Sequence, residues 1–430
     1  MVSDIKFRTR DPSLALSGNL DSQIVLELAV WGAVAARIGL YVVRRGGTGY
    51  LRSAFANRGL AFKTLTAFAV LIWFSSFYAP APLLSLTRGS LWIALVIVWI
   101  VACHVLRSPE RLVAFWTVTR RAIWATGLAA VAVIGILTGS LAPGDRYTWF
   151  GSHPTTTSAA IGLIVITLLG TIFGSHDPWF DRRLGSSLRL AMLALFSWLL
   201  IATKARGALA ATVAAAIVVA VLHSRRARGD SFVVLMGIVA SAVVLWRVAE
   251  SFAQEFILRN QTSEQLVTLT GRTELAEGAL PLIWERPLLG HGYLAARSLF
   301  LEIAWGAGEA HNLLLEVLVS TGIVGLALLS FFLLRLFLSQ LRLVRRRGSM
   351  APLGRESMSL IVFLLVQGVV AEGFVGAPGI ETVALLWGVI LSDAASQNEG
   401  RSQGSGREKP HRIRAHRRQL ATVGASPSQN

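Results

Sequence analysis

The sequence predicts an all-α polytopic membrane protein with about 11–12 transmembrane helices and one large external, periplasmic loop that contains short helices. Two observations support this fold class. Hydrophobic residues make up 53% of the 430 residues, and the mean hydropathy is +0.58. Apolar runs of about 17 to 22 residues recur along the chain, and a helix of that length crosses the hydrocarbon core of a bilayer.

The apolar runs predict about eleven helices in chain order. They lie near residues 23–43, 60–78, 90–106, 122–138, 157–173, 187–203, 207–222, 231–248, 312–334, 357–373 and 378–393. Together they form a transmembrane domain over residues 23–393. The polar segment 1–22 shows no cleavable signal pattern. Residues 394–430 are rich in Ser, Gly, Gln and Arg, which predicts a disordered basic cytoplasmic tail.

The basic loops predict the orientation of the helices, because Arg-rich loops stay on the cytoplasmic side. Every second loop is Arg-rich: Arg44 to Arg58, Arg107 to Arg121, Arg182 to Arg189, Arg225 to Arg228 and Arg342 to Arg355. The loops 79–89, 139–156 and 249–311 are therefore predicted to be external. The N-terminus is then external as well, unless a further short helix precedes residue 23.

The net charge of +17 does not indicate nucleic acid as a partner. Most basic residues lie in short clusters between apolar runs, where they orient helices. Membrane lipids are expected partners, and the tail cluster from Arg407 to Arg418 is either solvated or in contact with anionic headgroups. The single cysteine, Cys103, lies in an apolar run, which excludes an internal disulfide and a thiolate metal site.

A polar interruption of the apolar pattern holds the motif around Arg272. This arginine is expected to open a short external helix, because Leu275 and Ala279 follow at helical spacing and Pro287 stops it. Pro281 within the segment predicts a kink or an early end. An arginine at a helix start is unfavourable for the helix dipole. Its position therefore implies an anionic partner, either a glutamate of the external loop or a bound phosphate.

Two further polar positions are predicted on the same side of the membrane. Asn312 is a candidate N-cap for the long helix that follows, which places His311 at the outer membrane interface. The turn with Lys204 and Arg206 interrupts two apolar runs; these cations either reach lipid headgroups or bind a phosphate. The planar guanidinium of Arg206 suits paired hydrogen bonds to phosphate or pyrophosphate oxygens. We therefore expect Arg206, Arg272 and His311 to converge on one pocket.

Several motifs keep a common order and a common predicted side of the membrane. They are Arg146 to Pro154 with its Arg, Gly and His-Pro pair, Ala205 to Leu209, Gly271 to Thr273, Arg286 to Gly292, His311 to Glu316 and Thr321 to Gly325. Together these motifs resemble the O-antigen ligase and polymerase superfamily over about residues 60 to 393. The sequence departs from the family pattern at Pro281, at Lys204 where small residues are common, and in its apparent helix number, since the family usually has about twelve.

The resemblance implies a metal-independent membrane glycosyltransferase without a cofactor. Such an enzyme moves a glycan from an undecaprenyl-pyrophosphate carrier to an acceptor hydroxyl, with inversion at the anomeric carbon, in the inner membrane of a bacterium. Arg206 and Arg272 would bind the pyrophosphate and stabilise its growing negative charge. His311 would orient or deprotonate the acceptor. The substrate-binding candidates are Lys204, Arg146, Arg286, His291 and Asn312.

Several alternatives stay open. The family includes ligases, with a lipid core as the acceptor, and polymerases, with a glycan as the acceptor. It also includes teichuronic-type polymerases and protein O-glycosylating enzymes. A transporter or flippase of lipid-linked or anionic substrates is the alternative class, although the charges lie mostly at helix ends and no repeat is evident. A metal-dependent polyprenyl-phosphate glycosyltransferase would need acidic pairs in an early external loop, where only Asp145 stands beside Arg146. The oligomeric state is not predicted.

Overall fold

The structure is a computed structural model that describes residues 22–139, 146–149, 154–174, 183–224, 272–303, 311–345, 350–371, 373–376 and 379–396. Its helical elements are α2 (Ser22–Arg44), α3 (Gly47–Ala56), α4 (Leu60–Ser75), η2 (Ser76–Tyr78), α5 (Pro82–Val105), α6 (Pro109–Thr138), α7 (Pro154–Phe173), α8 (Arg183–Ala202), α9 (Arg206–Ser224), α13 (Arg272–Glu285), α14 (Ala296–Ile303), α15 (Leu313–Arg345), α16 (Ala351–Val370) and η3 (Gly373–Val375). Residues 380–396 form a further helix. The described residues contain helices and no strand, which confirms the all-α class.

Seven helices of the described chain are long and apolar enough to cross a membrane, which confirms the predicted polytopic membrane protein. They are Leu60–Tyr78, Pro82–Val105, Pro109–Thr138, Pro154–Phe173, Gly185–Ala202, Arg206–His223 and Leu313–Arg345. Helices α2, α16 and 380–396, also predicted as membrane helices, are not among them. The predicted helix 231–248 lies outside the described residues, as do residues 1–21 and 397–430.

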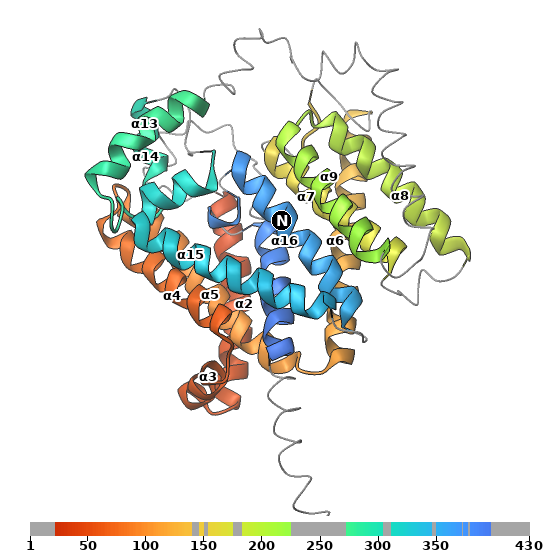
Figure 1. The fold of residues 1–430 in the computed structure, drawn as a ribbon, viewed down its shortest axis with the longest axis horizontal. Helices are drawn as coiled ribbons and strands as arrows, with labels where there is room; N and C mark the ends of the chain where they lie inside the picture. Colours follow the sequence, from red (N-terminus) through yellow and green to blue (C-terminus); the bar gives the residue numbers. More distant parts are fainter. Residues whose placement is uncertain are drawn as a thin grey trace, which may run out of the picture.

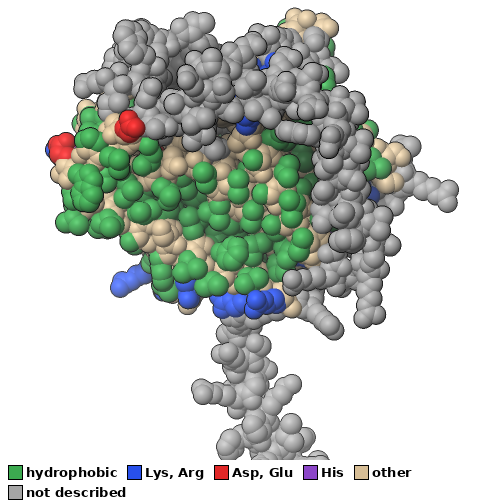
Figure 2. Space-filling view, turned by 45° about the horizontal axis from the view of Figure 1, so that its top comes forward, with side chains coloured by type: hydrophobic (Ala, Val, Ile, Leu, Met, Phe, Trp, Pro, Cys, Tyr) green, Lys and Arg blue, Asp and Glu red, His purple; other side chains and the backbone are tan. Residues whose placement is uncertain are grey.

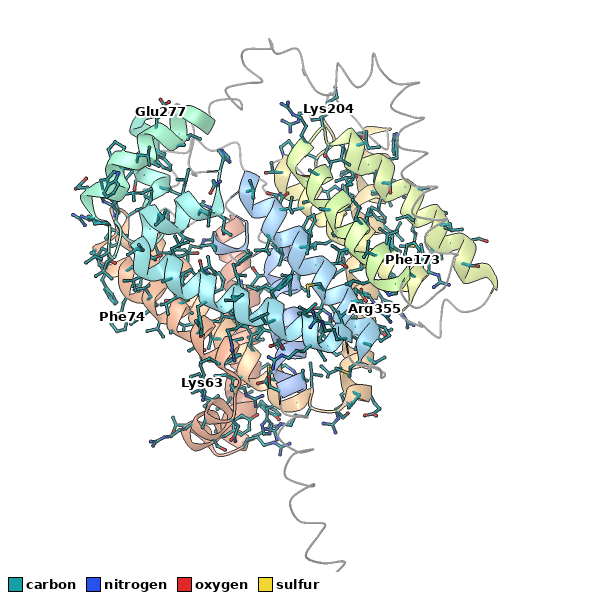
Figure 3. The ribbon with its side chains drawn as sticks, in the orientation of Figure 1. Lys63, Phe74, Phe173, Lys204, Glu277 and Arg355 are labelled. Carbon is teal, nitrogen blue, oxygen red and sulfur yellow. The ribbon has the colours of Figure 1, made fainter. Side chains whose placement is uncertain are left out.

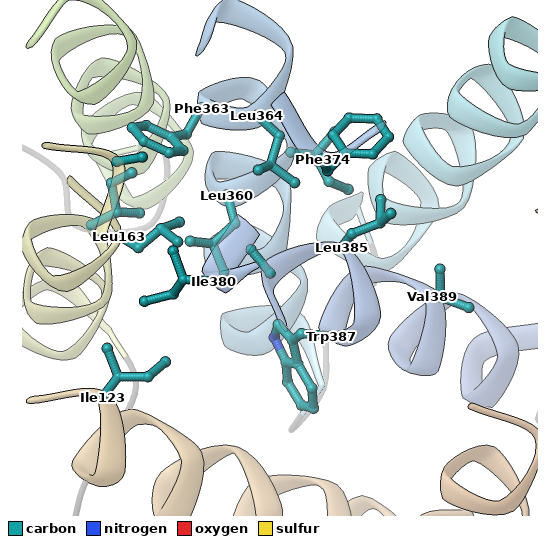
Figure 4. Close-up of a cluster of buried hydrophobic side chains, with 14 of the residues drawn as sticks. Ile123, Leu163, Leu360, Phe363, Leu364, Phe374, Ile380, Leu385, Trp387 and Val389 are labelled. Carbon is teal, nitrogen blue, oxygen red and sulfur yellow. The ribbon is translucent and has the colours of Figure 1, made fainter. Parts of the chain in front are cut away.

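Helix α7 is the most deeply buried of the seven. Its apolar stretch is 83% buried, against 28% for the corresponding stretches of α6 and α8. It packs against α8, α9 and α16, and α15 packs between α16 and α4 (Figure 1). Side chains such as Leu163 of α7, Phe363 of α16 and Trp387 of the last helix fill the core between these elements (Figure 4). The Trp387 ring also stacks on Trp116 of α6, with 4.4 Å between ring centroids.

The helices extend further than the apolar runs predicted. Helix α6 begins at Pro109 and not near residue 122, because Ser108 caps it and accepts a hydrogen bond from the Arg111 amide at 3.3 Å. Helix α16 likewise begins at Ala351 and not near residue 357. A hydropathy profile stops at charged residues, but Arg120 of α6 and Glu356 of α16 are buried as an ion pair of 3.2 Å. The predicted basic loop Arg44 to Arg58 contains helix α3.

Three helices share one end of the bundle. A Cβ on Gly162 of α7 would lie 2.6 Å from the Thr212 hydroxyl of α9 and 2.8 Å from the Phe363 ring of α16. Each of the three helices ends or begins six to eight residues from this contact, at Pro154 of α7, Arg206 of α9 and Val370 of α16. That separation is about 9–12 Å along a helix, so these three ends lie at the same end of the bundle. Helix α15 starts at the same end, because the Asn312 side-chain amide donates to the Val369 carbonyl at 3.1 Å. We call this the Arg206 end.

The opposite end of the bundle, which we call the Arg342 end, is basic. A Cβ on Gly354 of α16 would meet Leu343 of α15 at 2.9 Å, so the start of α16 and the end of α15 lie together there. Figure 2 shows hydrophobic side chains covering the middle of one face, with Lys and Arg side chains along its lower edge. A hydrophobic surface bordered by basic side chains fits a bilayer. Lys204 and Glu277 lie at the top of Figure 3 and Lys63 lies at its bottom.

Candidate active site

A tight turn between α8 and α9 places Lys204 and Arg206 at the Arg206 end. The Thr203 hydroxyl donates to the Leu200 carbonyl at 2.7 Å and accepts from the Ala205 amide at 3.2 Å. Lys204 has a φ of 52°, a left-handed conformation that is unfavourable for a residue with a side chain. The buried, hydrogen-bonded Thr203 thus holds the turn in a conformation that local preference alone would not select.

The segment that begins at Arg146 docks onto this turn. The Arg146 Nε donates to the Thr203 carbonyl at 3.3 Å, and the Tyr147 amide donates to the Ala202 carbonyl at 3.0 Å. The buried Tyr147 hydroxyl accepts a hydrogen bond from the Trp149 indole at 3.0 Å, which holds the segment in place. Sequence positions about sixty residues apart therefore meet at one place, and Arg146, Lys204 and Arg206 form a single cationic group, named here the cationic cluster.

The positive charges of Arg146 and Arg206 in the cationic cluster are close enough to affect each other. Burial lowers the pKa of Arg146, and the positive charge of Arg206 lowers it further. The Arg146 guanidinium stays charged, because the ordinary pKa of an arginine lies far above neutral pH. A site where two such charges repel each other favours an anion that hydrogen-bonds to both.

The Arg286 to Gly292 motif and the Thr321 to Gly325 motif hold each other through backbone hydrogen bonds. Gly322 breaks the helical path of α15 with a φ of 62° and a ψ of −163°. Around this break, the Ile323 amide donates to the Pro287 carbonyl at 2.8 Å, and the His291 amide donates to the Val319 carbonyl at 2.8 Å. The break in α15 therefore leaves its backbone groups paired. We call this arrangement the loop–helix lock.

The loop–helix lock requires glycines, because the backbone of the loop and the backbone of α15 come too close together to leave room for a side chain. A Cβ on Gly290 would lie 2.6 Å from the Ser320 carbonyl carbon, and a Cβ on Gly322 would lie 2.4 Å from that of Leu288. Both glycines also have positive φ. The glycine motifs of the sequence are thus explained by contact between the external-loop segment and the membrane helix.

The structure places the two candidate residues of this loop differently. His291 is buried, and its Nε2 lies 2.8 Å from the Leu282 carbonyl, which makes it part of the packing between the loop and α13. Arg286 is exposed at the start of the loop. Their predicted roles in substrate binding stay predictions, and the geometry gives His291 a structural role in addition.

Tyr293, which the sequence analysis did not single out, connects four parts of the fold. Its backbone amide donates to the Ser75 hydroxyl at 3.1 Å, and its carbonyl accepts from the Ser85 hydroxyl at 2.6 Å. The phenol oxygen accepts from the Trp92 indole at 3.1 Å and lies 2.9 Å from the Gly376 carbonyl. The sequence signal for this role is the position of Tyr293 directly after the Gly-His-Gly turn. A tyrosine buried at such a turn needs hydrogen-bond partners for its hydroxyl, and here they come from other parts of the fold.

His311 and Asn312 lie at the Arg206 end, at the start of α15. The Asn312 side-chain oxygen accepts from the amides of Leu314 and Leu315 at 2.8 and 3.2 Å, which confirms the predicted N-cap. His311 has a φ of 49° and is half-buried. Lys204 and His311 are two of the three non-glycine residues with positive φ in the described chain. Such outliers concentrate at functional sites.

Helix α13 begins at Arg272 and ends at Glu285, directly before the Pro287 turn, which confirms the predicted short helix. It runs through Pro281 without an early end. Leu275 and Ala279 pack on Phe300 of α14 and Val319 of α15, so the helix is fixed to the start of α15. The Arg272 side chain lies outside the described part of the structure.

The structure thus brings Arg146, Lys204 and Arg206 together and places His311 and Asn312 at the same end. Convergence of Arg206, Arg272 and His311 on one pocket stays a prediction. Among the described side chains, no three of His, Cys, Asp and Glu lie together where they could hold a metal ion. The expectation that the reaction needs no metal is not tested by this observation.

Comparison with known proteins finds a family model that matches the middle of the chain. The model of the O-antigen ligase family matches residues 190–330, which include Lys204, Arg206, Arg272 and His311. No curated protein matches the chain. A solved chain from a study of polymerization and crosslinking by a peptidoglycan synthase complex is similar at 15% identity and a TM-score of 0.44, covering 79% of this chain and 98% of that one. That likeness is too low to carry a conclusion.

The family match spans the turn before α9, the start of α13 and the start of α15, where the candidate residues lie. It therefore supports an O-antigen ligase or polymerase type of role in polysaccharide biosynthesis. Residues 190–330 of this multi-pass membrane protein thus match the O-antigen ligase family.

Proposed function

We propose that the chain is a metal-independent, inverting glycosyltransferase that moves a glycan from an undecaprenyl-pyrophosphate carrier to an acceptor hydroxyl. The observation that carries this proposal is the cationic cluster, in which Arg146 docks on the Thr203 turn beside Arg206. A pyrophosphate offers several charged oxygens to such a group, and guanidinium donors match them in pairs. The cluster therefore suits a diphosphate leaving group, which needs negative charge stabilised as it departs.

The proposed reaction is a single displacement. The acceptor oxygen attacks the anomeric carbon from the side opposite the carrier, a new C–O bond forms, and the bond to the pyrophosphate oxygen breaks with its electron pair. Arg206 and Arg272 stabilise the charge that grows on that oxygen. His311 accepts the proton of the acceptor hydroxyl, a task that suits an imidazole. Fixed cations replace the role that a divalent ion has in other transferases.

The remaining candidates have supporting roles in this proposal. Lys204 and Arg146 contact the diphosphate from the cationic cluster, whereas Arg286 and Asn312 contact the glycan or the acceptor. His291 contributes by holding the loop at α13. The acceptor is either a growing glycan, which makes the protein a polymerase, or a lipid core, which makes it a ligase.

We further propose that the Arg206 end faces the periplasm of a bacterial inner membrane. Basic residues at the Arg342 end support this orientation, because Arg-rich segments stay cytoplasmic. The segment 249–311 then forms the external loop. The helix 380–396 extends past residue 394, where the tail was predicted to begin, so the cytoplasmic tail starts after residue 396. A lipid-linked donor presented at the outer face reaches the cationic cluster in this arrangement.

An in vitro reaction tests the proposal. The purified full chain is incubated with an undecaprenyl-pyrophosphate-linked glycan and acceptor, and release of the carrier and the size of the product are followed. We expect wild type to release carrier, and His311→Ala, Arg272→Ala and Arg206→Lys to lose release, because lysine cannot form the paired hydrogen bonds of a guanidinium. A ladder of products identifies a polymerase, and a single addition to the acceptor identifies a ligase.

Two controls make the outcome specific. His104→Ala changes a half-buried histidine at the far end of α5 and should retain carrier release. EDTA should leave the rate unchanged. Full transfer by Arg272→Ala would remove Arg272 from the site, and transfer that depends on added metal would refute the metal-independent mechanism. If folded wild type releases no carrier with any donor, a transporter or flippase becomes the better explanation.

A further inference from the structure

A pocket at the Arg342 end has the composition of an anion site. It is open to the surface and lies between the start of α4, the last turns of α15 and the helix 380–396. Its walls include Leu60, Arg335, Ser339 and Ser392. It is remote from the cationic cluster, which lies at the opposite end of the bundle.

Three polar side chains face this pocket without a partner of their own. Ser339 and Ser392 are only 4% and 5% exposed, and within the described residues neither hydroxyl makes a hydrogen bond. Arg335 is half-buried, and in the same part of the chain its guanidinium has no hydrogen bond or ion pair. Buried hydroxyls and guanidinium groups normally have partners, so this arrangement points to a ligand that accepts hydrogen bonds.

The start of α4 adds backbone donors to the same pocket. Helix α4 has 16 residues, and no side chain caps its N-terminus at Gly59. The Gly59 amide donates to the Asp393 carboxylate at 3.3 Å, whereas the amides of Leu60, Ala61 and Phe62 have no partner within the helix. Helix N-termini with free amides bind phosphate and other anions.

The charges around the pocket favour an anion. Asp393 lines the wall, but its carboxylate is held in a buried ion pair with Arg58. Arg335 and Arg342 bring positive charge to the wall, and the Arg342 Nε donates to the Leu338 carbonyl at 3.4 Å. The pocket therefore combines two guanidinium groups, two hydroxyls and free amides around one space.

We propose that this pocket binds a phosphate group, either the headgroup phosphate of an anionic phospholipid or a free phosphate. The flanking surface of α15 favours the lipid, because Leu334 and Leu338 are 53% and 40% exposed beside Arg335 and offer an apolar path for acyl chains. Basic pockets between membrane helices bind anionic headgroups in this way. The proposal is independent of the transferase mechanism, because no residue of the pocket belongs to the candidate active site.

Native mass spectrometry of the purified, delipidated full chain tests this proposal. Dioctanoylphosphatidylglycerol is titrated into wild type, Arg335→Gln and Arg345→Gln, and the fraction of protein with bound lipid is counted. Arg345 is the matched control, because it is exposed in the last turn of α15 and does not line the pocket. We expect Arg335→Gln to weaken binding by about tenfold and Arg345→Gln to bind like wild type.

Two further arms separate the sources of the phosphate. Dioctanoylphosphatidylcholine, which has no net charge, should bind more weakly than phosphatidylglycerol. Competition by millimolar inorganic phosphate would identify free phosphate as a ligand, and binding of phosphatidylglycerol without such competition would identify the lipid. If Arg335→Gln does not fold, Ser339→Ala should weaken binding by about two- to tenfold. Equal binding by wild type and a folded variant of the pocket, or equal binding of the two lipids, would overturn the proposal.

Discussion

Replacing Gly322 by alanine is expected to destabilise the protein and to abolish glycan transfer. The Gly322 backbone, with a φ of 62° and a ψ of −163°, lies in a region that only glycine adopts readily, and forcing alanine there costs about 1–3 kcal/mol. The added Cβ would also lie 2.4 Å from the Leu288 carbonyl and 2.7 Å from the Leu289 amide nitrogen. Displacing packed backbone costs about another 1–3 kcal/mol, for a total of about 2–6 kcal/mol.

The loss of activity follows from the position of the loop. The loop–helix lock holds the turn that directly follows α13, and α13 begins with Arg272. Opening the lock by more than an ångström would move α13 relative to α15, and catalytic geometry tolerates displacements of only about 1 Å. Transfer should therefore fall even in molecules that remain folded.

The assay compares the midpoint of thermal unfolding, followed by tryptophan fluorescence, with the release of carrier in the transfer reaction. Gly139→Ala is the matched control, because Gly139 also has a positive φ, 67°, but a Cβ there meets nothing within 4 Å. The control should lose only the cost of the left-handed backbone, about 1 kcal/mol. The reasoning would be refuted if the Gly322→Ala protein had the same midpoint of thermal unfolding as Gly139→Ala and transferred glycan at the wild-type rate.

Further predictions concern single contacts, and thermal unfolding checks each of them. Asn312→Ala should cost about 0.5–2 kcal/mol through loss of the N-cap of α15, and an unchanged midpoint would show that the cap is dispensable. Arg120→Met should cost about 3–5 kcal/mol, because Glu356 is left buried without its partner, and the double change Arg120→Met/Glu356→Leu should restore most of this loss; a double variant as unstable as the single one contradicts this. Lys204→Gly should raise stability by about 1 kcal/mol by relieving the left-handed φ, whereas a fall would mean that the side chain itself stabilises the turn.

Hydropathy was sufficient to predict the class of the fold, because the bilayer imposes a length and a polarity on every spanning helix. It failed at Arg120, where the charge predicts the end of a helix but the helix continues. The charge is tolerated because Glu356, 236 residues further along the chain, neutralises it inside the bundle. A pairing of that kind depends on how helices pack, and a profile along one chain contains no information about it.

The candidate site was predictable where one local rule determines the geometry. Asn312 as an N-cap and the helix from Arg272 both depend on neighbouring residues alone, and both are confirmed. The docking of Arg146 on the Thr203 turn was not predictable from spacing, because it joins separate loops through backbone contacts. The same holds for Tyr293, whose partners come from α4, α5 and the segment before the last helix.

The loop–helix lock has a consequence for exchanging parts between related enzymes. The backbone of Pro287 and Leu288 is paired with residues 323 and 324, so neither partner can be replaced alone without leaving amides unpaired beside a membrane. A chimera that imports a foreign external loop must therefore import residues 286–324 as one cassette. The part of this protein that can be exchanged as a whole is therefore a loop together with the first half of the helix that follows it.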